Sequence, residues 1–365
     1  MYDVVVLSLA EGGGGGCGSS CGCAADTSPA AEGGRALDDS GHAPGDSDRA
    51  SGGSGCAEGG CDSGGSGCGD HAVCGPRQGG PRTPVLACAD ALRDAGARVE
   101  TVTASSDAEI DAVIARFDSE PRTDGLSWPD ADSKLRLVIA TAADGQLRAV
   151  LRRLVRRYAP PPSCRPADLA DGRTVPDLPP VAILPLDPGG TTDLAAQLGL
   201  PREPAAVAEA VLGSSVRRLD LLRNDGGSVT LDGALVGGAD DAGRAVPWRG
   251  RVEVDDAVLT DGDDPVLACA IGNGSGYAEF DGLPLLTGVD PTDGRVEVAV
   301  AVPVTVKRRL RTTRVRVEVR RARGRAVSIL PRDGELPFLD DGVHGTLSRK
   351  RSWWTEPGAW AVYAS

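Results

Sequence analysis

Apolar runs of strand character alternate with stripes of helical spacing in the first half of the chain, and this alternation constrains the fold most. Tyr2 to Leu9, Leu135 to Thr141 and Val181 to Leu186 are short apolar runs with many β-branched residues, which indicates buried strands. Segments of helical spacing lie between them along the chain. Strands that alternate with helices predict parallel pairing and an α/β layer architecture.

The helical segments have recognisable periods and caps. Apolar residues from Val85 to Ala95 follow one helical stripe, and a strand is expected to begin at Val99 to Val102. Ser106 is expected to cap the next helix, because its hydroxyl can accept a first-turn N–H group. The remaining helices are predicted over Asp107–Phe117, Gln146–Tyr158 and from Thr191 onward.

Helical stripes vanish after about Ser214, and short alternating strands separated by Gly and Asp follow. This pattern predicts an antiparallel β-sandwich domain over 214–365, whose C-terminal segment could return to the first domain. The α/β nucleotide-binding-type domain is predicted over 83–213, with 1–10 as its first strand. The predicted strands of the second half are SVTLDG, RGRVEVDDAVL, PVLACAIGN, GRVEVAVAV, TTRVRVEVRRARGRAVSIL and GAWAVYA.

Residues 11–82 form a Gly- and Cys-rich insertion that has no aromatic residue and no isoleucine. Such a segment buries too little apolar surface to offset the entropy of ordering, so we predict that it is disordered. Its cysteines match no strong metal-binding spacing, and we expect no metal site there. The seven are Cys17, Cys21, Cys23, Cys56, Cys61, Cys68 and Cys74.

Charge and hydropathy exclude several classes of protein. The net charge of -13 and the pI of about 4.8 argue against nucleic acid as a partner, which needs a basic surface. No apolar run approaches the roughly 20 residues of a membrane helix. The start of the chain lacks the features of a signal peptide, so we expect a cytoplasmic protein.

Three glycine-containing turns are candidate sites. Gly189 and Gly190 follow a strand and precede a helix capped by Thr192 or Asp193, which is the arrangement of an anion-binding turn. Asp144-Gly145 follows the strand at Thr141, where open α/β sheets bind ligands. Asn273 ends a strand among glycines. Each turn can also be read as a plain connection, a tight turn or hairpin punctuation.

The order of these segments resembles the diacylglycerol kinase catalytic-domain family, which is related to the NAD kinases. The family's GGDGT turn has its counterpart in AADGQ, residues 142–146, and its PLGTGNDFAxxLG motif in PLDPGGTTDLAAQLG, residues 185–199. VRRLDLLRN, IGNGSGY, GVDPTDGRVEVAV and EPGAWAV follow in the family's order. The similarity covers about Leu86 to Ser365 and the first strand.

Departures from the family motifs fall on the residues that should hold phosphates. Ala142, Ala143 and Gln146 replace two glycines and the threonine of GGDGT, and Thr192 replaces an asparagine. The family's NPxSG loop is missing. Its DGE motif could lie at Asp333-Gly334-Glu335, but the context favours Asp341-Gly342-Val343, which lacks the glutamate.

The resemblance implies Mg-ATP-dependent phosphorylation of a lipid hydroxyl, with diacylglycerol as the commonest acceptor in the family. Asp341 would be the general base and Asn273 would support the cleft. The nucleotide would contact Asp144, Gly145, Gly189, Gly190, Thr191, Thr192 and Asp193. The alternative is a catalytically inactive homologue that binds lipid, nucleotide or a protein partner.

A basic segment suggests where such a protein could meet lipid. Lys307 to Arg325 alternates arginine with valine, and Trp353 and Trp354 follow a second basic run. A basic surface with interfacial tryptophan suits an anionic membrane, so peripheral attachment is one expectation. The other expectation is that the basic strand face is solvated and that the tryptophans lie in the core. A homo-oligomer is compatible with either expectation.

Overall fold

The computed structural model describes residues 1–10, 82–307 and 313–364. The predicted disordered insertion, 11–82, lies outside the described residues except for Arg82, which begins a helix instead. The seven cysteines of the insertion, His42 and His71 also lie outside the described residues. Within the described residues, no helix is both long enough and apolar enough to cross a membrane.

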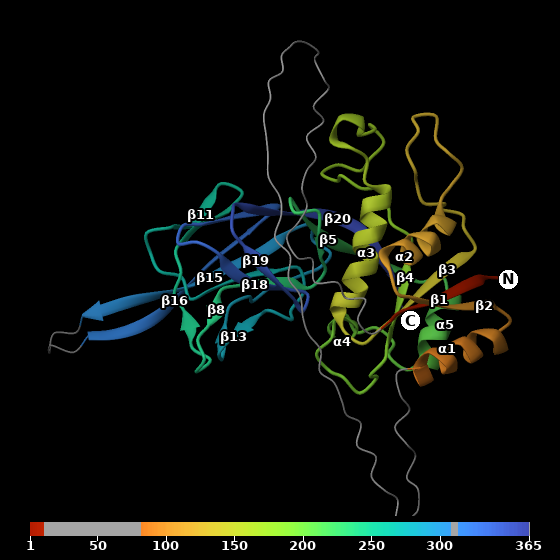
Figure 1. The fold of residues 1–365 in the computed structure, drawn as a ribbon, viewed down its shortest axis with the longest axis horizontal. Coiled ribbons are helices and arrows are strands. Elements are labelled where there is room, and N and C mark those ends of the chain that lie inside the picture. Colours follow the sequence, from red (N-terminus) through yellow and green to blue (C-terminus); the bar gives the residue numbers. More distant parts are fainter. Residues whose placement is uncertain (11–81, 308–312, 365) are drawn as a thin grey trace, which may run out of the picture. The chain divides into compact units, whose positions relative to one another are not determined.

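Four parallel strands form the centre of the N-terminal part (Figure 1). They run in the order β2 (Arg98–Ala104), β1 (Asp3–Leu9), β3 (Leu135–Thr141) and β4 (Val181–Pro185). The first strand alternates its side chains between two cores, so both of its faces are buried. Val5 and Leu7 belong to one core, whereas Val4 and Val6 belong to the other.

Helices cover both faces of this sheet. α1 (Arg82–Asp94) and α5 (Pro204–Leu212) share a core with Val4 and Val6. α2 (Asp107–Ile114), followed by a 3₁₀ turn to Phe117, and α3 (Asp144–Tyr158) pack against the opposite face. Ser106 caps α2 as predicted, because its Oγ accepts the Glu109 N–H at 3.3 Å.

The C-terminal part consists of two sheets packed face to face. One contains β16 (Thr313–Gly324), β15 (Val296–Lys307), β12 (Ala268–Gly272), β7 (Gly233–Val236), β18 (Leu336–Asp340) and β19 (Val343–Leu347) in that order. The other continues from the parallel sheet through β20 (Arg351–Tyr363) to β17 (Ala326–Pro331), β10 (Gly250–Val254) and β11 (Ala257–Asp261). Val252, Ile329 and Trp353 from the second sheet share a core with Cys269 and Val298 from the first. This is the sandwich that the strand pattern predicts.

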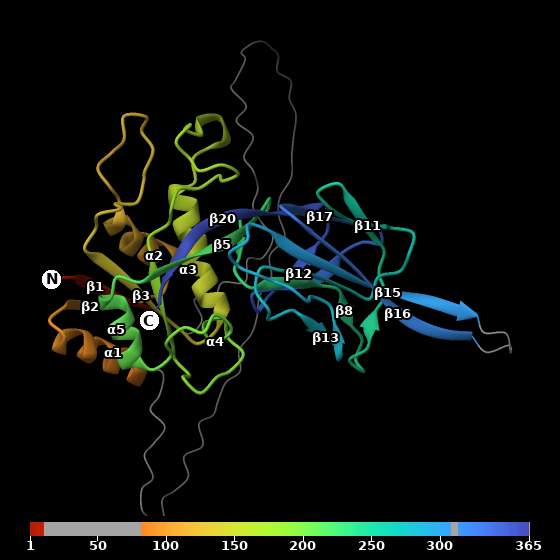
Figure 2. The same ribbon diagram turned by 180° about the vertical axis from the view of Figure 1, so that it is seen from behind.

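The strand bounds show how the second half is divided. β20 pairs with β17 near Trp353, with β5 along its length and with β4 at Val362, so one strand joins the two parts (Figure 2). The strands are β5 (Val216–Asn224), β6 (Val229–Thr230), β7 (Gly233–Val236), β8 (Gly238–Ala239), β9 (Ala245–Val246), β10 (Gly250–Val254), β11 (Ala257–Asp261), β12 (Ala268–Gly272), β13 (Glu279–Phe280), β14 (Leu283–Pro284), β15 (Val296–Lys307), β16 (Thr313–Gly324), β17 (Ala326–Pro331), β18 (Leu336–Asp340), β19 (Val343–Leu347) and β20 (Arg351–Tyr363).

Two of the predicted strands need correction. TTRVRVEVRRARGRAVSIL forms two strands, β16 and β17, which belong to different sheets. RGRVEVDDAVL is a hairpin rather than one strand, because Asp255 adopts a positive φ of 47° and turns the chain between β10 and β11. Trp353 is buried in the sandwich core, and Trp354 is half-buried with Arg223 over its ring. Trp353 therefore does not lie at a membrane-facing surface, while Val315 and Val317 on β16 are exposed.

Candidate functional site

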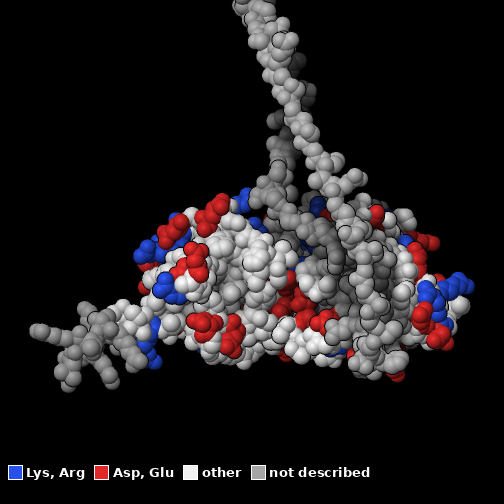
Figure 3. Space-filling model, turned by 60° about the horizontal axis from the view of Figure 1, so that its bottom comes forward, with Lys and Arg blue, Asp and Glu red and all other residues white. Residues whose placement is uncertain are grey.

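The structure brings two predicted motifs together where α3 begins. A Cβ added to Gly145 would lie 2.9 Å from Val343 Cγ2 and 3.5 Å from the carbonyl oxygen of Asp341. The first turn of α3 therefore packs against the turn between β18 and β19. We call this region, with Asp144, Asp193, Asp232, Asp340 and Asp341, the acidic junction. Three of these residues, Asp232, Asp340 and Asp341, are buried. On the surface, Figure 3 shows acidic side chains gathered near the middle of one face of the molecule.

Asp341 occupies a two-residue hairpin turn and directs its side chain inward. Its φ of 47° and that of Gly342, 77°, are the left-handed conformations that such turns require. The side chain is 0% exposed. Its oxygens accept the backbone N–H groups of Leu231, Asp232 and Gly233 at 2.7, 2.9 and 3.2 Å. The carboxylate thus fastens the hairpin to the segment before β7.

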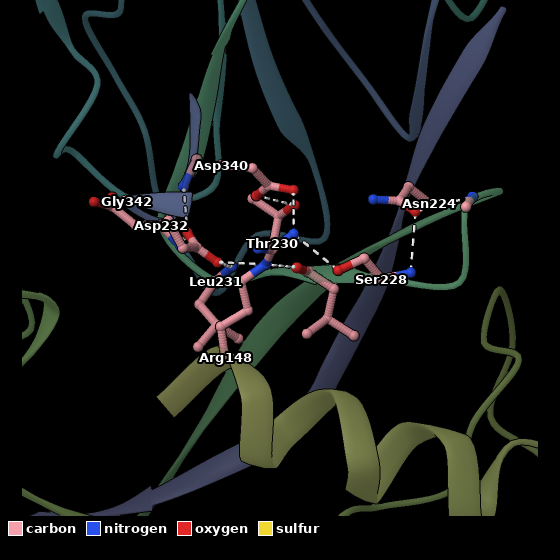
Figure 4. Close-up of polar contacts among 12 residues, drawn as sticks. Arg148, Asn224, Ser228, Thr230, Leu231, Asp232, Asp340 and Gly342 are labelled. Atoms are coloured by element: carbon pink, nitrogen blue, oxygen red, sulfur yellow. Dashed lines mark hydrogen bonds and ion pairs between the residues drawn. The ribbon is translucent and has the colours of Figure 1, made fainter. Parts of the chain in front are cut away.

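Arg148 on α3 provides the positive charge beside this carboxylate (Figure 4). Its Nη2 donates to Asp340 at 2.7 Å, and its Nε lies 3.9 Å from Asp341 Oδ2. Thr230 Oγ1 also donates to Asp340, at 2.7 Å. Burial and the neighbouring Asp340 carboxylate raise the pKa of Asp341, whereas Arg148 opposes the rise.

Asp144, the first residue of α3, is the half-buried carboxylate of the junction. Both of its oxygens accept the Leu194 N–H, at 3.1 and 3.2 Å. Burial raises the pKa of Asp144 to about 6, and the carboxylates of Asp232 and Asp193 add to the rise. Asp144 therefore changes charge closer to neutral pH than an ordinary aspartate does.

Replacing Asp144 with asparagine is expected to stabilise the protein near pH 8. A carboxyl whose pKa is raised on folding favours the folded state below that pKa, and this advantage is lost as pH rises from about 4 through about 6. Asparagine keeps an acceptor for Leu194 and carries no charge. Urea unfolding should show a gain of about 1 kcal/mol at pH 8 that shrinks towards pH 4. An equal effect at both pH values would contradict the raised pKa.

The glycine turn before α4 (Leu194–Gln197) is occupied by the chain's own groups. Gly189 N–H donates to Asp187 Oδ1 at 3.1 Å, and Gly190 N–H donates to the Asp187 carbonyl at 3.2 Å. Arg202 donates to the carbonyls of Asp187 and Pro188, both at 3.0 Å. This turn, which the sequence predicts to bind an anion, thus surrounds a guanidinium group of the same chain.

The remaining predicted residues lie around this turn. Thr191 and Thr192 are exposed, and Asp193 caps α4 by accepting the Ala196 N–H at 2.9 Å while it pairs with Arg202. Asn273 is buried and donates to the Asp220 and Leu231 carbonyls at 3.0 and 2.7 Å. It therefore fastens β12 to β5 and to the segment before β7.

Gln197, which motif comparison misses, bridges the two parts of the fold. Its Nε2 donates to Asp232 at 2.9 Å, and its Oε1 accepts the Ser275 N–H at 3.1 Å. Arg148 and Arg202 are also missed, because their partners are distant in sequence. The sequence indicates Arg148 only as a basic residue one turn into α3.

Several backbone donors that the resemblance assigns to the phosphates of Mg-ATP have partners within the chain. The glycine N–H groups that should face phosphate donate to Asp187, and Val343 leaves no room for a side chain at position 145. Gln146 Oε1 accepts the Ala142 N–H at 2.7 Å, which occupies a further backbone donor. No group of three or more potential metal ligands is found among the described residues.

Comparison with known proteins agrees with the resemblance seen in the sequence. Residues 78–224 match the diacylglycerol kinase catalytic domain. No curated protein matches the chain. The structure resembles that of a diacylglycerol kinase from Bacillus anthracis str. Sterne, with a TM-score of 0.52 and 15% identity over 79% of this chain and 93% of that one.

A second structure, of a putative diacylglycerol kinase from the same organism, gives a TM-score of 0.52 at 16% identity with the same coverage. At such low identity these similarities establish the fold alone. They confirm the predicted α/β domain followed by a β-sandwich, as in the kinases of this family.

Proposed function

We propose that this chain is a lipid kinase-like protein that binds ligands without transferring phosphate. Its residues 78–224 match the diacylglycerol kinase catalytic domain. The observation that carries this proposal is the position of Asp341. A general base must lie within hydrogen-bond reach of the hydroxyl that it deprotonates. Asp341 is fully buried, and its oxygens already accept three backbone N–H groups.

The other motif residues support the same conclusion. Phosphoryl transfer depends on positioned donors and on positive charge around the transferred group. Here Asp193 pairs with Arg202, Asp144 accepts from Leu194, and the donors of Gly189 and Gly190 are used within their own turn. These contacts stabilise the junction itself and leave its carboxylates to repel a triphosphate.

An assay of lipid phosphorylation tests the proposal. Full-length protein would be incubated with γ-labelled Mg-ATP and mixed micelles of diacylglycerol, and labelled lipid would be measured. We expect no labelled lipid above the protein-free control. Formation of labelled lipid in proportion to the protein concentration would contradict the proposal.

The second candidate is a phosphotransferase in which Asp144 takes the proton of the lipid hydroxyl. It is favoured by one observation: Asp144 is only partly buried, and its pKa of about 6 suits a general base near neutral pH. If labelled lipid forms, the activity of the Asp144→Asn variant shows whether Asp144 is the base. Loss of activity in folded D144N would establish this candidate, and retained activity would exclude it.

A further inference from the structure

A cavity lies at the other end of the parallel strands, away from the acidic junction. Leu135 and Arg136, which begin β3, line it together with residues 176–180, which precede β4. The junction, in contrast, forms where β3 ends and α3 begins. The cavity has a volume of about 580 Å³, within the range of small-molecule sites.

Part of the wall of this cavity is apolar, although the lining as a whole exposes more polar than apolar surface. Trp128, Leu178 and Tyr363 line it, along with four prolines. Leu178 and Tyr363 are buried, so they are held by the core beneath them. Arg122 stacks over Trp128 at 4.5 Å and pairs with Asp168 at 3.1 Å, which fixes one rim of the cavity. A rigid apolar wall of this kind suits the body of an organic molecule.

Arg173 gives the cavity an unusual buried donor. Its side chain is only 7% exposed, and its Nη1 donates to Asp177 at 2.5 Å. Its Nε and Nη2 are buried and have no hydrogen-bond partner in the described part of the chain. Most buried polar groups are hydrogen-bonded, and an unpaired donor beside a cavity calls for an explanation.

Arg218 lies beside the same carboxylate. Its Nη2 is 3.0 Å from Asp177 Oδ2, and its side chain is 40% exposed. Two guanidinium groups therefore share one carboxylate, and burial together with nearby Arg173 lowers the pKa of Arg218. Around Asp177 itself, one further negative charge would balance the second guanidinium group. The other carboxylates of the lining are Asp130 and Asp168, and Asp168 pairs with Arg122. A third arginine, Arg136, lies over the Tyr363 ring at 5.0 Å.

We propose that this cavity binds a small organic anion, a carboxylate or phosphate group attached to an apolar body. The anionic group would lie against Arg173 and Arg218, because guanidinium groups bind both types of oxyanion in bidentate fashion. The apolar body would lie against Trp128, Leu178 and Tyr363. Binding requires a small rotation of the Arg173 side chain. The unpaired nitrogens of Arg173 then donate new N–H···O bonds to the anion, and these bonds offset the cost of the rotation.

Titration calorimetry of the full chain with four probes tests this inference. Decanoate and decyl phosphate carry both required features, decanol lacks the charge, and inorganic phosphate lacks the apolar body. We expect saturable binding of at least one of the first two and at least about tenfold weaker binding of decanol and of phosphate. The better of the two anions identifies the head group.

Variants place the binding in the cavity. Arg173→Met and Arg218→Gln should each weaken binding of the better probe by at least about tenfold, the loss expected for a charged hydrogen bond. Arg316→Gln, an exposed arginine on β16, should leave it unchanged. Because Arg218 is partly exposed, its variant tests the site even if the Arg173 variant fails to fold.

Three results would overturn the inference: no saturable binding of either anion at millimolar concentration, equal binding of decanol, or unchanged binding by folded Arg218→Gln. The cavity shares no lining residue with the acidic junction. The inference therefore stands or falls separately from the proposed function.

Discussion

Replacing Asp341 with alanine is expected to lower the free energy of unfolding by about 3–5 kcal/mol. The substitution removes the acceptor for three buried backbone N–H groups and leaves Arg148 with one carboxylate instead of two. Each buried donor left without a partner costs about 1–3 kcal/mol, and relief of the repulsion from Asp340 offsets only part of this. Urea unfolding monitored by circular dichroism measures the change.

Asp333→Ala is the matched control, because Asp333 begins the competing DGE sequence. Its side chain is 49% exposed, and its ion pair with Arg249 is long, at 3.9 Å. This variant should change stability by no more than about 0.5 kcal/mol. If Asp341→Ala were as stable as the wild type, the carboxylate would not have the structural role assigned to it.

Glu356→Ala is expected to be similarly destabilising, by about 3–5 kcal/mol. The side chain is 0% exposed, and it accepts from Thr174 N at 2.5 Å and from Trp354 Nε1 at 2.9 Å. Its carboxylate also lies 3.5 Å from the mostly buried Arg223. Without it, two N–H donors would lose their acceptor and Arg223 would lose its ion-pair partner, although Arg223 also donates to Thr174 Oγ1. Thermal and urea unfolding would both detect the loss.

Glu318→Ala provides the control for this prediction. Glu318 is exposed on β16 and pairs with Arg320 two residues away, an arrangement that contributes little to stability. The stability of Glu356→Gln should fall between the stabilities of Glu356→Ala and Glu318→Ala, because glutamine keeps one acceptor oxygen. A Glu356→Ala variant no less stable than Glu318→Ala would show that the buried contacts of Glu356 are not stabilising.

The layer architecture could be predicted because it follows from local patterns. β3 spans Leu135–Thr141 as predicted, since a β-branched run buried on both faces has few alternatives. The helix predicted from Gln146 begins two residues earlier, at Asp144, because Asp144-Gly145 forms its first turn rather than a separate one. α5 was not predicted, since its short alanine-rich stripe follows a proline.

The polar contacts of the junction could not be predicted in the same way. Motif order indicated that Asp144 and Asp341 belong to one site, and the structure places both at the acidic junction. No pattern indicated that Asp341 would be buried under three N–H groups, or that Arg202 would lie in the glycine turn. Such contacts depend on how distant strands and loops pack, which local periodicity does not encode.

Calorimetric titration of the folded full chain with Mg-ATP tests the central claim most directly. We predict no saturable binding at millimolar nucleotide, because the donors of the glycine turn are already used and the junction carboxylates repel the phosphates. Saturable binding at micromolar concentration would contradict the account. It would mean that the junction opens to receive the nucleotide, and phosphoryl transfer would again become the leading hypothesis.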